Sequence, residues 1–337
     1  MSHAILLLAH GTPDTLDQMA EYLSYVTNGR PMPQHIVEEL QHRYAEIGLR
    51  NEPLPEGPPL THWTLEQGRL LSEKLGQKVY VGMRNWHPFL ADVVAQMKQD
   101  GITRATVLCL APQNSRTSTG LYRRALDKAL EGAFPYTFIA GWAEHPLLAK
   151  AFAQKLEPAW LAANARQGRK VPVLFTAHSV PCRTLRPATE QQAAEGSNRP
   201  GQHTPAEGLQ NYGAAAEGDP YPSECKRTAA LVAQQLVPAG MESADWFFAF
   251  QSQGVAGAPW IGPSVEDTLT ALAEEGHKAV VIQPIGFLCD HVEILYDIDI
   301  NFRDFGKEHG LEISRPESLN ASPLLIEAIA DVLARNA

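Results

Sequence analysis

The sequence lacks several features that would assign it to a membrane or secreted class. Its 337 residues include only four cysteines, without a CxxC pair, so we expect neither disulfides nor a four-thiolate metal site. The longest apolar runs, such as residues 4–9, fall far short of the roughly 18 residues that a membrane-spanning helix needs. No basic leader with a cleavage site opens the chain, so no signal peptide is expected. These absences predict a cytoplasmic protein without stable membrane insertion.

Basic charge and phosphate-binding loops are also scarce. Lys and Arg total 28 against 38 Asp and Glu, a formal net charge of -10. A nucleic-acid-binding protein would show a basic stripe, so no nucleic-acid partner is expected. Neither a GxGxxG nor a GxxxxGK loop follows any strand-like run, which argues against a nucleotide ligand. A few local arginines would still suffice to bind an anionic small ligand. Separately, no feature of the sequence requires more than a monomer.

What the chain does contain is an alternation of strand-like and helix-like segments, repeated about eight times. The predicted strands are residues 4–9, 78–83, 105–110, 136–140, 171–176, 246–250, 278–282 and 311–314. They are continuous apolar runs, which are typical of parallel sheets covered by helices on both faces. The sequence therefore predicts an α/β fold.

The two halves of the chain resemble each other. The segment ILLLAHG (5–11) resembles VLFTAHS (173–179), and VLCLAPQN (107–114) resembles VVIQPIGF (280–287) in shape. We interpret the halves as two related doubly wound domains, with ligands expected at the carboxyl ends of the strands. His10 and His178 would then occupy equivalent positions.

One stretch, residues 183–217, departs from the alternation. It is rich in Ala, Glu, Gln, Gly and Pro, has almost no apolar periodicity, and is too long for an ordinary connection. A flexible surface insertion is the first interpretation, and a lid over the ligand site is the functional alternative.

Acidic residues follow the strand at 278–282. Glu293, Asp297 and Asn301 lie four apart, so in a helix they share one face. With His178 after another strand, Glu293 would form an open two-ligand site suited to Fe²⁺ or Zn²⁺, in which the imidazole is neutral. The alternatives are a solvated helix face for the acids, a structural role for His178, and an ordinary turn histidine for His10.

Several longer motifs resemble one known family. They are FTAHSVP (175–181), GDPYP (218–222), FQSQG (250–254), PWIGPSVEDTL (259–269) and PIGFLCDHVEILYDID (284–299). In order and spacing they are similar to ferrochelatases across nearly the whole chain. HRYAEIG, YVGMRNWHPF, GITRATVLCLAP and LYRRA especially resemble the coproporphyrin ferrochelatases of bacteria.

The resemblance implies a fold and a reaction. The fold would be two Rossmann-like, chelatase-type domains, each a parallel four-stranded sheet flanked by helices, with the C-terminal helix packing back. The first domain would be residues 1–147 plus 318–337 and the second residues 148–317, interrupted by the insertion 183–217. The enzyme would insert Fe²⁺, its substrate metal, into a porphyrin in haem biosynthesis. No iron–sulfur cluster is expected, since no cysteine follows Cys289.

Site residues carry over position by position. His178 and Glu293 match the family's pair at the metal; which delivers iron and which takes the pyrrole protons is left open. Asp297 continues the family's acidic line and is assigned to the metal as well. The residues assigned to the porphyrin are His10, Arg43, Tyr44, Tyr122 and Gln251.

This sequence also departs from the family pattern. His10 stands where bacterial relatives carry a tyrosine that reaches the iron, which makes His10 a candidate axial ligand. Gln113 replaces a histidine, Asn301 replaces an acid, and Thr27 stands where an arginine is expected.

The preferred substrate is coproporphyrin III. Its four carboxylates suit a polar rim, and residues 15–33 are largely polar where membrane-bound ferrochelatases carry an apolar lip. The alternatives are protoporphyrin IX as substrate, a cobalt or nickel chelatase, and a non-catalytic haem or porphyrin carrier that clamps iron between His10 and His178.

Overall fold

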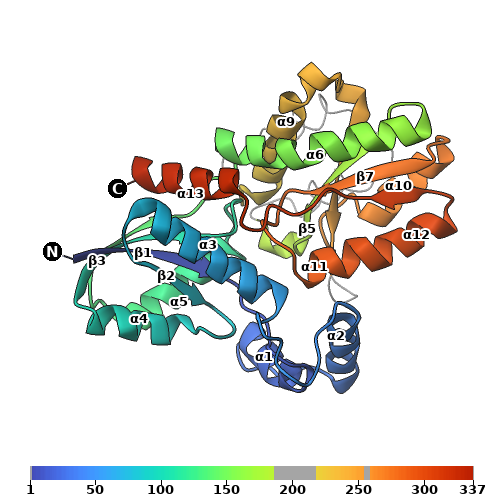
Figure 1. Ribbon diagram of the computed structural model, residues 1–337. Helices are drawn as coiled ribbons and strands as arrows, with labels where there is room; N and C mark the ends of the chain where they lie inside the picture. The colour runs from blue at the N-terminus through green and yellow to red at the C-terminus, as the bar shows by residue number, and fades with distance from the viewer. Residues whose placement is uncertain (1, 186–217, 254–258, 337) are drawn as a thin grey trace.

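The computed structural model of the chain describes residues 2–185, 218–253 and 259–336. The chain forms two lobes (Figure 1). The first lobe contains the sheet of β1–β4 and the second contains the sheet of β5–β8. Of the predicted insertion 183–217, only residues 183–185 are described, and Cys182–Thr184 form a short 3-10 turn; the rest lies outside the described residues. Within the described residues, no helix combines the length and apolar character needed to cross a membrane.

The two sheets have the same parallel topology. The first has the order β2–β1–β3–β4, from Val79–Met83, Ser2–Ala9, Ile102–Cys109 and Tyr136–Ile139. The second has the order β6–β5–β7–β8, from Trp246–Gln251, Val173–His178, Ala279–Pro284 and Glu312–Ser314. Thus β5 corresponds to β1 and β7 to β3, as the internal resemblance predicts. The predicted fold of two Rossmann-like domains is confirmed.

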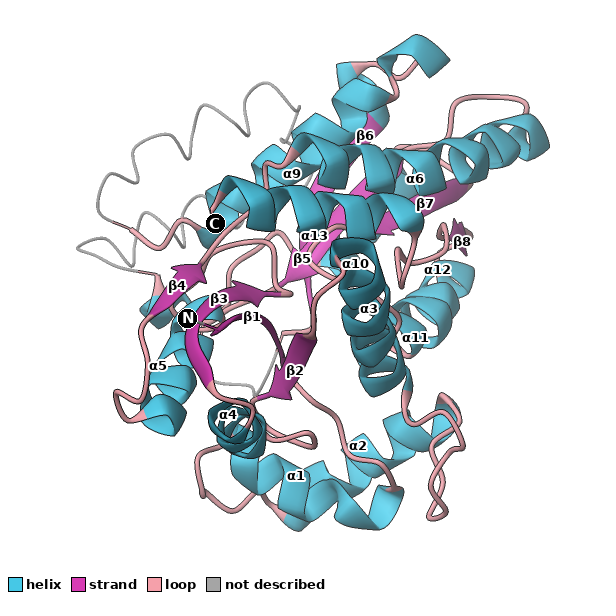
Figure 2. Cartoon of the chain, turned by 60° about the vertical axis from the view of Figure 1, so that its left-hand side comes forward, coloured by secondary structure: helices cyan, strands magenta, loops and turns pink. Residues whose placement is uncertain are grey.

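Helices lie on both faces of the sheets (Figure 2). Those described are α1 (Met19–Val26), α2 (Gln34–Glu46), α3 (Pro59–Leu75), α4 (Leu90–Gln99), α5 (Thr119–Leu130), α6 (Pro146–Gln167), α9 (Tyr221–Gln235), α10 (Val265–Glu274), α11 (Val292–Leu295), α12 (Arg303–Glu308) and α13 (Pro323–Arg335). In the first lobe α3 covers one face, while α4 and α5 cover the other; in the second lobe α6 and α9 lie opposite α10.

Strand β1 shows why its sequence is continuously apolar. Ile5 and Leu7 point into the cluster that holds Leu71 of α3. Leu6 and Leu8 point to the opposite face, into the cluster under α4 and α5. Successive side chains of a strand alternate between faces, so a strand covered on both sides has no position for a polar residue.

One hydrophobic core runs through both lobes. The same cluster contains Leu7 of β1, Phe175 of β5, Trp160 of α6 and Leu325 of α13. Helix α13 packs against both α3 and α6, so the C-terminal helix packs back on the first lobe as predicted (Figure 2). The domain boundaries at 147/148 and 317/318 stay a prediction, because the core crosses between the lobes without a break.

The acidic segment after β7 differs from the single helix that its spacing predicts. Helix α11 is followed by a π-helical turn, Asp297–Phe302, which leads into α12. Here the Asn301 amide donates to the Tyr296 carbonyl five residues back, at 2.9 Å. This wider turn takes Asn301 off the face that carries Glu293, and Asn301 is exposed. The expectation that Asn301 shares a helix face with Glu293 and Asp297 is therefore wrong.

Candidate active site

His178 and Glu293 meet at the carboxyl end of the second sheet. His178 is the last residue of β5, and Glu293 lies on α11, which follows β7, the neighbour of β5. His178 Nε2 lies 3.1 Å from Glu293 Oε1. Nδ1 of the same ring bonds to the Ser179 carbonyl, which fixes the ring so that Nε2 faces the carboxylate. Both side chains are about one-third exposed, so a ligand can reach them.

The Glu293 carboxylate is shared with a second histidine. His291 Nε2 lies 3.3 Å from Glu293 Oε2, while His291 Nδ1 lies 2.9 Å from the Cys289 carbonyl. The Glu293 backbone is held as well, because Gln251 Nε2 donates to its carbonyl at 2.7 Å. Each oxygen of the carboxylate therefore faces its own imidazole.

Burial and charge act in opposite directions on this pair. Burial lowers the pKa of His178, but the Glu293 charge and hydrogen bond outweigh it and raise that pKa to about 9. Burial raises the pKa of Glu293, but His178 and then His291 hold it well below its usual range. The metal-free pair is thus imidazolium and carboxylate at neutral pH. The neutral imidazole assumed from sequence does not apply until a metal or a base removes its proton.

Asp297 lies one turn further along the segment. Its side chain is only 9% exposed and accepts a hydrogen bond from the Ser252 hydroxyl. Arg43 Nη1 lies 3.9 Å from Asp297 Oδ1, and the guanidinium also lies 5.4 Å from the centre of the Tyr296 ring. Burial raises the pKa of Asp297 to about 6, although Ser252 and Arg43 oppose the rise. Asp297 therefore changes charge near neutral pH.

His10 follows β1, at the position that corresponds to His178. Asn85 Nδ2 donates to its Nε2 at 3.0 Å, and its Nδ1 lies 3.1 Å from the Gly11 carbonyl. The Tyr22 hydroxyl is 3.2 Å from the same Nδ1. Burial, followed by the charge of Arg84, lowers the pKa of His10 to about 4. His10 is thus a neutral imidazole whose two ring nitrogens are both engaged within the first lobe.

The turn that places His10 depends on Gly11, and we expect Gly11→Ala to destabilise the fold by about 2 kcal/mol. Gly11 has φ +88, and an added Cβ would lie 2.8 Å from the Trp86 backbone nitrogen. Gly29 is a matched control, because its φ is +83 but nothing lies within 4 Å of an added Cβ. Urea unfolding of both alanine variants would separate the clash from the backbone strain. Equal losses would contradict the role of the Trp86 contact.

The other residues assigned to the porphyrin from sequence are largely buried. Tyr44 accepts a hydrogen bond from Thr12 at 3.3 Å, and burial raises its pKa to about 12. Tyr122 of α5 lies in the core cluster under β1, with the Arg84 guanidinium 5.7 Å from its ring centre. Gln251 is 1% exposed. Its amide oxygen accepts from Thr176 and its nitrogen holds the Glu293 carbonyl, so we propose a supporting role for Gln251 in place of porphyrin contact.

Both lobes contribute to one electrostatic environment. Burial raises the pKa of Tyr22 and of Tyr44, and the Glu293 charge adds to both rises; the same charge opposes the lowered pKa of His10. Val292 of α11 packs against the cluster that contains Tyr22 and Tyr44. The first-lobe group around His10 therefore faces the second-lobe group around Glu293.

Two residues near His178 and Glu293 were not among the site residues predicted from sequence. His291 shares Glu293, and its position two residues before Glu293 was a usable signal. Ser252 has φ +60 and holds Asp297, and only the Gln-Ser pair after β6 pointed to it. Left-handed backbone at a non-glycine residue costs free energy, so it persists only where the surrounding structure stabilises it. Such residues are concentrated at functional sites.

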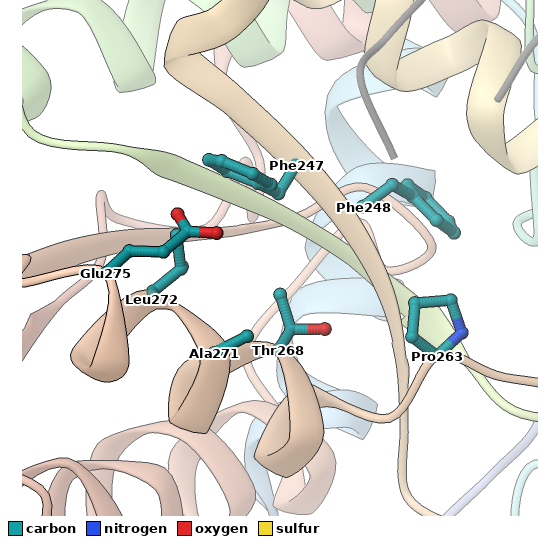
Figure 3. Close-up of a pocket in the computed structure, with 7 residues that line it drawn as sticks. All are labelled: Phe247, Phe248, Pro263, Thr268, Ala271, Leu272 and Glu275. Carbon is teal, nitrogen blue, oxygen red and sulfur yellow. The ribbon is translucent and has the colours of Figure 1, made fainter. Parts of the chain in front are cut away.

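A separate apolar pocket lies between β6 and α10 (Figure 3). Phe247, Thr268 and Leu272 are among the residues that line it. It contains none of the candidate site residues. The candidate site thus consists of the groups at the carboxyl ends of the two sheets.

The chemistry of the pair suits a metal that is passed on. Among the residues that the structure describes, no group of three or more His, Cys, Asp or Glu side chains is arranged to hold a metal ion. A resident structural metal usually has a complete ligand set, whereas one imidazole and one carboxylate leave coordination positions open. The open positions can accept water or the nitrogens of another ligand.

Comparison with known proteins agrees with this geometry. The ferrochelatase family model matches residues 2–337. A ferrochelatase of Acidobacterium capsulatum is 55% identical over 97% of this chain and 92% of that protein. A coproporphyrin III ferrochelatase of Geobacillus kaustophilus is 32% identical over 98% of this chain and 94% of that protein.

Among solved structures, SirB from Bacillus subtilis with Fe³⁺ is similar in fold. Its TM-score is 0.52 at 11% sequence identity, and the match covers 100% of this chain and 96% of that one. The fold, the match along nearly the whole sequence and the identity to relatives lead to the same result: the chain belongs to the ferrochelatase family.

Proposed function

We propose that this ferrochelatase inserts Fe²⁺ into coproporphyrin III, with His178 and Glu293 as the residues at the metal. The observation that carries the proposal is the 3.1 Å contact between His178 Nε2 and Glu293 Oε1 at the carboxyl end of β5. Ligands of doubly wound sheets bind at that end of the strands. The pair also combines a base that can ligate iron with a carboxylate that can offset the charge of iron.

During the reaction this pair must both lose the proton of His178 and accept protons from the porphyrin. Each Fe²⁺ that enters the ring releases two pyrrole N–H protons, which leaves the iron–porphyrin core neutral. In the metal-free enzyme His178 already carries a proton, so that proton must leave before Nε2 can bind iron or accept from a pyrrole. The shared carboxylate of Glu293 connects His178 with His291, which offers a second imidazole for proton transfer. We assign iron delivery and the acceptance of the pyrrole protons to His178 and Glu293 jointly.

Asp297 is proposed as a further contact for incoming iron. Ser252 and Arg43 hold its carboxylate, and the charges of Glu293 and His178 both act on it, so it lies close to the pair. Because its pKa is about 6, the side chain is mostly ionised at pH 7 and can bind a metal ion without first losing a proton. Arg43 limits how tightly a dication is held there, which favours transfer over retention.

Unpaired positive charge supports coproporphyrin III as the substrate. Within the described part of the chain, Arg84 forms no ion pair with a carboxylate, and its buried Nε has no hydrogen-bond partner; Arg84 follows β2, and its charge acts on His10. The relative from Geobacillus kaustophilus is named for coproporphyrin III. A guanidinium pairs bidentately with a carboxylate, and coproporphyrin presents four carboxylates where protoporphyrin IX presents two.

We expect kcat/KM for coproporphyrin III to exceed that for protoporphyrin IX by about tenfold or more, the effect of one additional charge-assisted contact. Anaerobic Fe²⁺ insertion by the purified protein, followed for each porphyrin, measures the ratio. Arg84→Met should reduce the ratio. Faster turnover of protoporphyrin IX would contradict the substrate assignment while leaving the metal pair in place. Tight binding of both porphyrins without turnover would favour the carrier function.

A further inference from the structure

We propose that Arg315 is a positioning residue for the iron site. With Ser318 and Asn320 it forms a polar clamp, here called the 315–320 clamp, that holds both ends of the acidic segment 290–299. The inference rests on the proposed function of Glu293. It adds a residue that touches neither iron nor porphyrin and acts through the acids it holds.

The four carboxylates of the acidic segment divide into two pairs. Glu293 and Asp297 bond to His178 and Ser252 at the active site. Asp290 and Asp299, which flank them in sequence, bond to the clamp. The inner pair is therefore available to a ligand, and the outer pair is used inside the protein.

Arg315 contacts both outer acids. Its Nε donates to Asp299 Oδ1 at 2.9 Å and its Nη2 donates to Asp299 Oδ2 at 2.7 Å, a bidentate pair. The same Nη2 lies 3.2 Å from Asp290 Oδ1. Nη1 donates to the Pro316 carbonyl at 3.1 Å, so every nitrogen of the guanidinium has an acceptor. With its side chain 10% exposed, this group is fixed and has little access to water.

Asp290 is held even more completely. Ser318 Oγ donates to Oδ1 at 2.7 Å, and Asn320 Nδ2 donates to Oδ2 at 3.0 Å. The backbone N–H of Asp290 donates to Asn320 Oδ1 at 2.9 Å. Gln67 of α3 in turn donates to the Asn320 carbonyl at 2.6 Å, and Gln67 is buried. The start of the acidic segment is thus connected to a helix of the first lobe.

The backbone of the segment has little regular support of its own. Helix α11 contains four residues and leads into the π-helical turn, and a helix this short is unstable in isolation. Side-chain bonds at Asp290 and Asp299 therefore fix the path along which Glu293 and Asp297 are presented. Arg315 also offsets the charge of the outer acids, which would otherwise attract iron away from His178.

The test compares Arg315→Met with Arg303→Met. Arg303 is a matched control, because its Nη2 lies 3.1 Å from the same Asp299 carboxylate but its side chain is 44% exposed. For Arg315→Met we expect kcat/KM for Fe²⁺ to fall by about tenfold or more, as for other outer partners of metal ligands. The Kd for porphyrin, measured by fluorescence quenching, should change by less than about twofold. Arg303→Met should stay within about twofold for both quantities.

Arg315→Lys adds a rescue measurement. Lysine restores the charge but cannot form the bidentate pair, so we expect partial recovery of kcat/KM for Fe²⁺. If Arg315→Met does not fold, Asp299→Asn keeps the side-chain volume and removes one held charge, and it should lower the same quantity by about threefold.

Three results would overturn the clamp: equal effects of the two methionine variants, equal losses for Fe²⁺ and porphyrin, or an Asp299→Asn variant that behaves as the parent. Parent-like activity of Glu293→Gln would instead contradict the proposed function itself. An inactive Glu293→Gln beside a fully active Arg315→Met would reject only the clamp.

Discussion

Glu293→Gln is expected to lower kcat for Fe²⁺ insertion by about a thousandfold, equivalent to about 4 kcal/mol of transition-state stabilisation. The amide keeps the shape of the side chain, including a group 3.1 Å from His178 Nε2. It removes the charge that offsets iron and the shared acceptor between His178 and His291. Both losses act on the metal-insertion step, so porphyrin binding should change by less than about threefold.

Single-turnover metallation with saturating porphyrin measures the loss directly, and porphyrin fluorescence measures the binding. Glu266→Gln is a suitable control, because Glu266 is also partly buried and lies on α10 outside the site. Comparable rates for the two variants would show that Glu293 has no role at the metal.

The rate of iron insertion should depend strongly on pH through His178. Its raised pKa, about 9, means that the imidazole is protonated below that pH in the metal-free enzyme. Iron competes with this proton, so kcat/KM for Fe²⁺ should rise by about tenfold per pH unit from pH 6 toward pH 8, about a hundredfold in total. The rate rises with pH because the Glu293 carboxylate stabilises the imidazolium form of His178 and not its free base.

Removal of the Glu293 charge should reverse the rise in the pKa of His178. In Glu293→Gln burial still disfavours the imidazolium, so the pKa of His178 should fall and the rising part of the profile should move to lower pH. Proton NMR of the His178 ring in the metal-free protein gives the pKa independently, with His178→Ala to assign the resonance. A His178 pKa near or below its ordinary value in the parent would contradict the ion pair.

His145 provides a comparison within the same chain. Its Nε2 lies 2.8 Å from Asp331 Oδ2, so it is also a histidine paired with a carboxylate, although its side chain is more deeply buried than that of His178. It lies at the start of α6, outside the active site. Replacing His145 should lower the stability of the fold and leave the pH profile of iron insertion unchanged. The comparison separates the loss of a histidine–carboxylate pair from the chemistry at His178.

Much of the fold followed from local pattern. Continuous apolar strands, such as Val173–His178, predict a parallel sheet because polar side chains have no solvated face in it. The resemblance between the segments around His10 and His178 predicted equivalent strands, and the shared strand order confirms this. Approximate element bounds were also predictable, since strand and helix periodicities differ and proline or glycine separates the segments.

Contacts between distant segments were not predictable in the same way. His178 and Glu293 are far apart in sequence, and their 3.1 Å contact requires that β5 and β7 be neighbours in one sheet. The spacing of Glu293, Asp297 and Asn301 predicted a common face, but the π-helical turn removed Asn301 from it. Helix type at that point depends on the packing of the turn and not on residue spacing alone.

The alternating α/β order, the equivalence of the two halves and the residue types at the strand ends are all predictable from sequence, because hydrophobic periodicity and strand-end position are local properties. Which of those residues act on each other depends on how the chain packs in three dimensions. This packing raises the pKa of His178 through Glu293, lowers that of His10 through burial and Arg84, and connects Arg315 to Asp290 and Asp299. Charge interactions and burial depend on distance in space, which the order of residues along the chain does not specify.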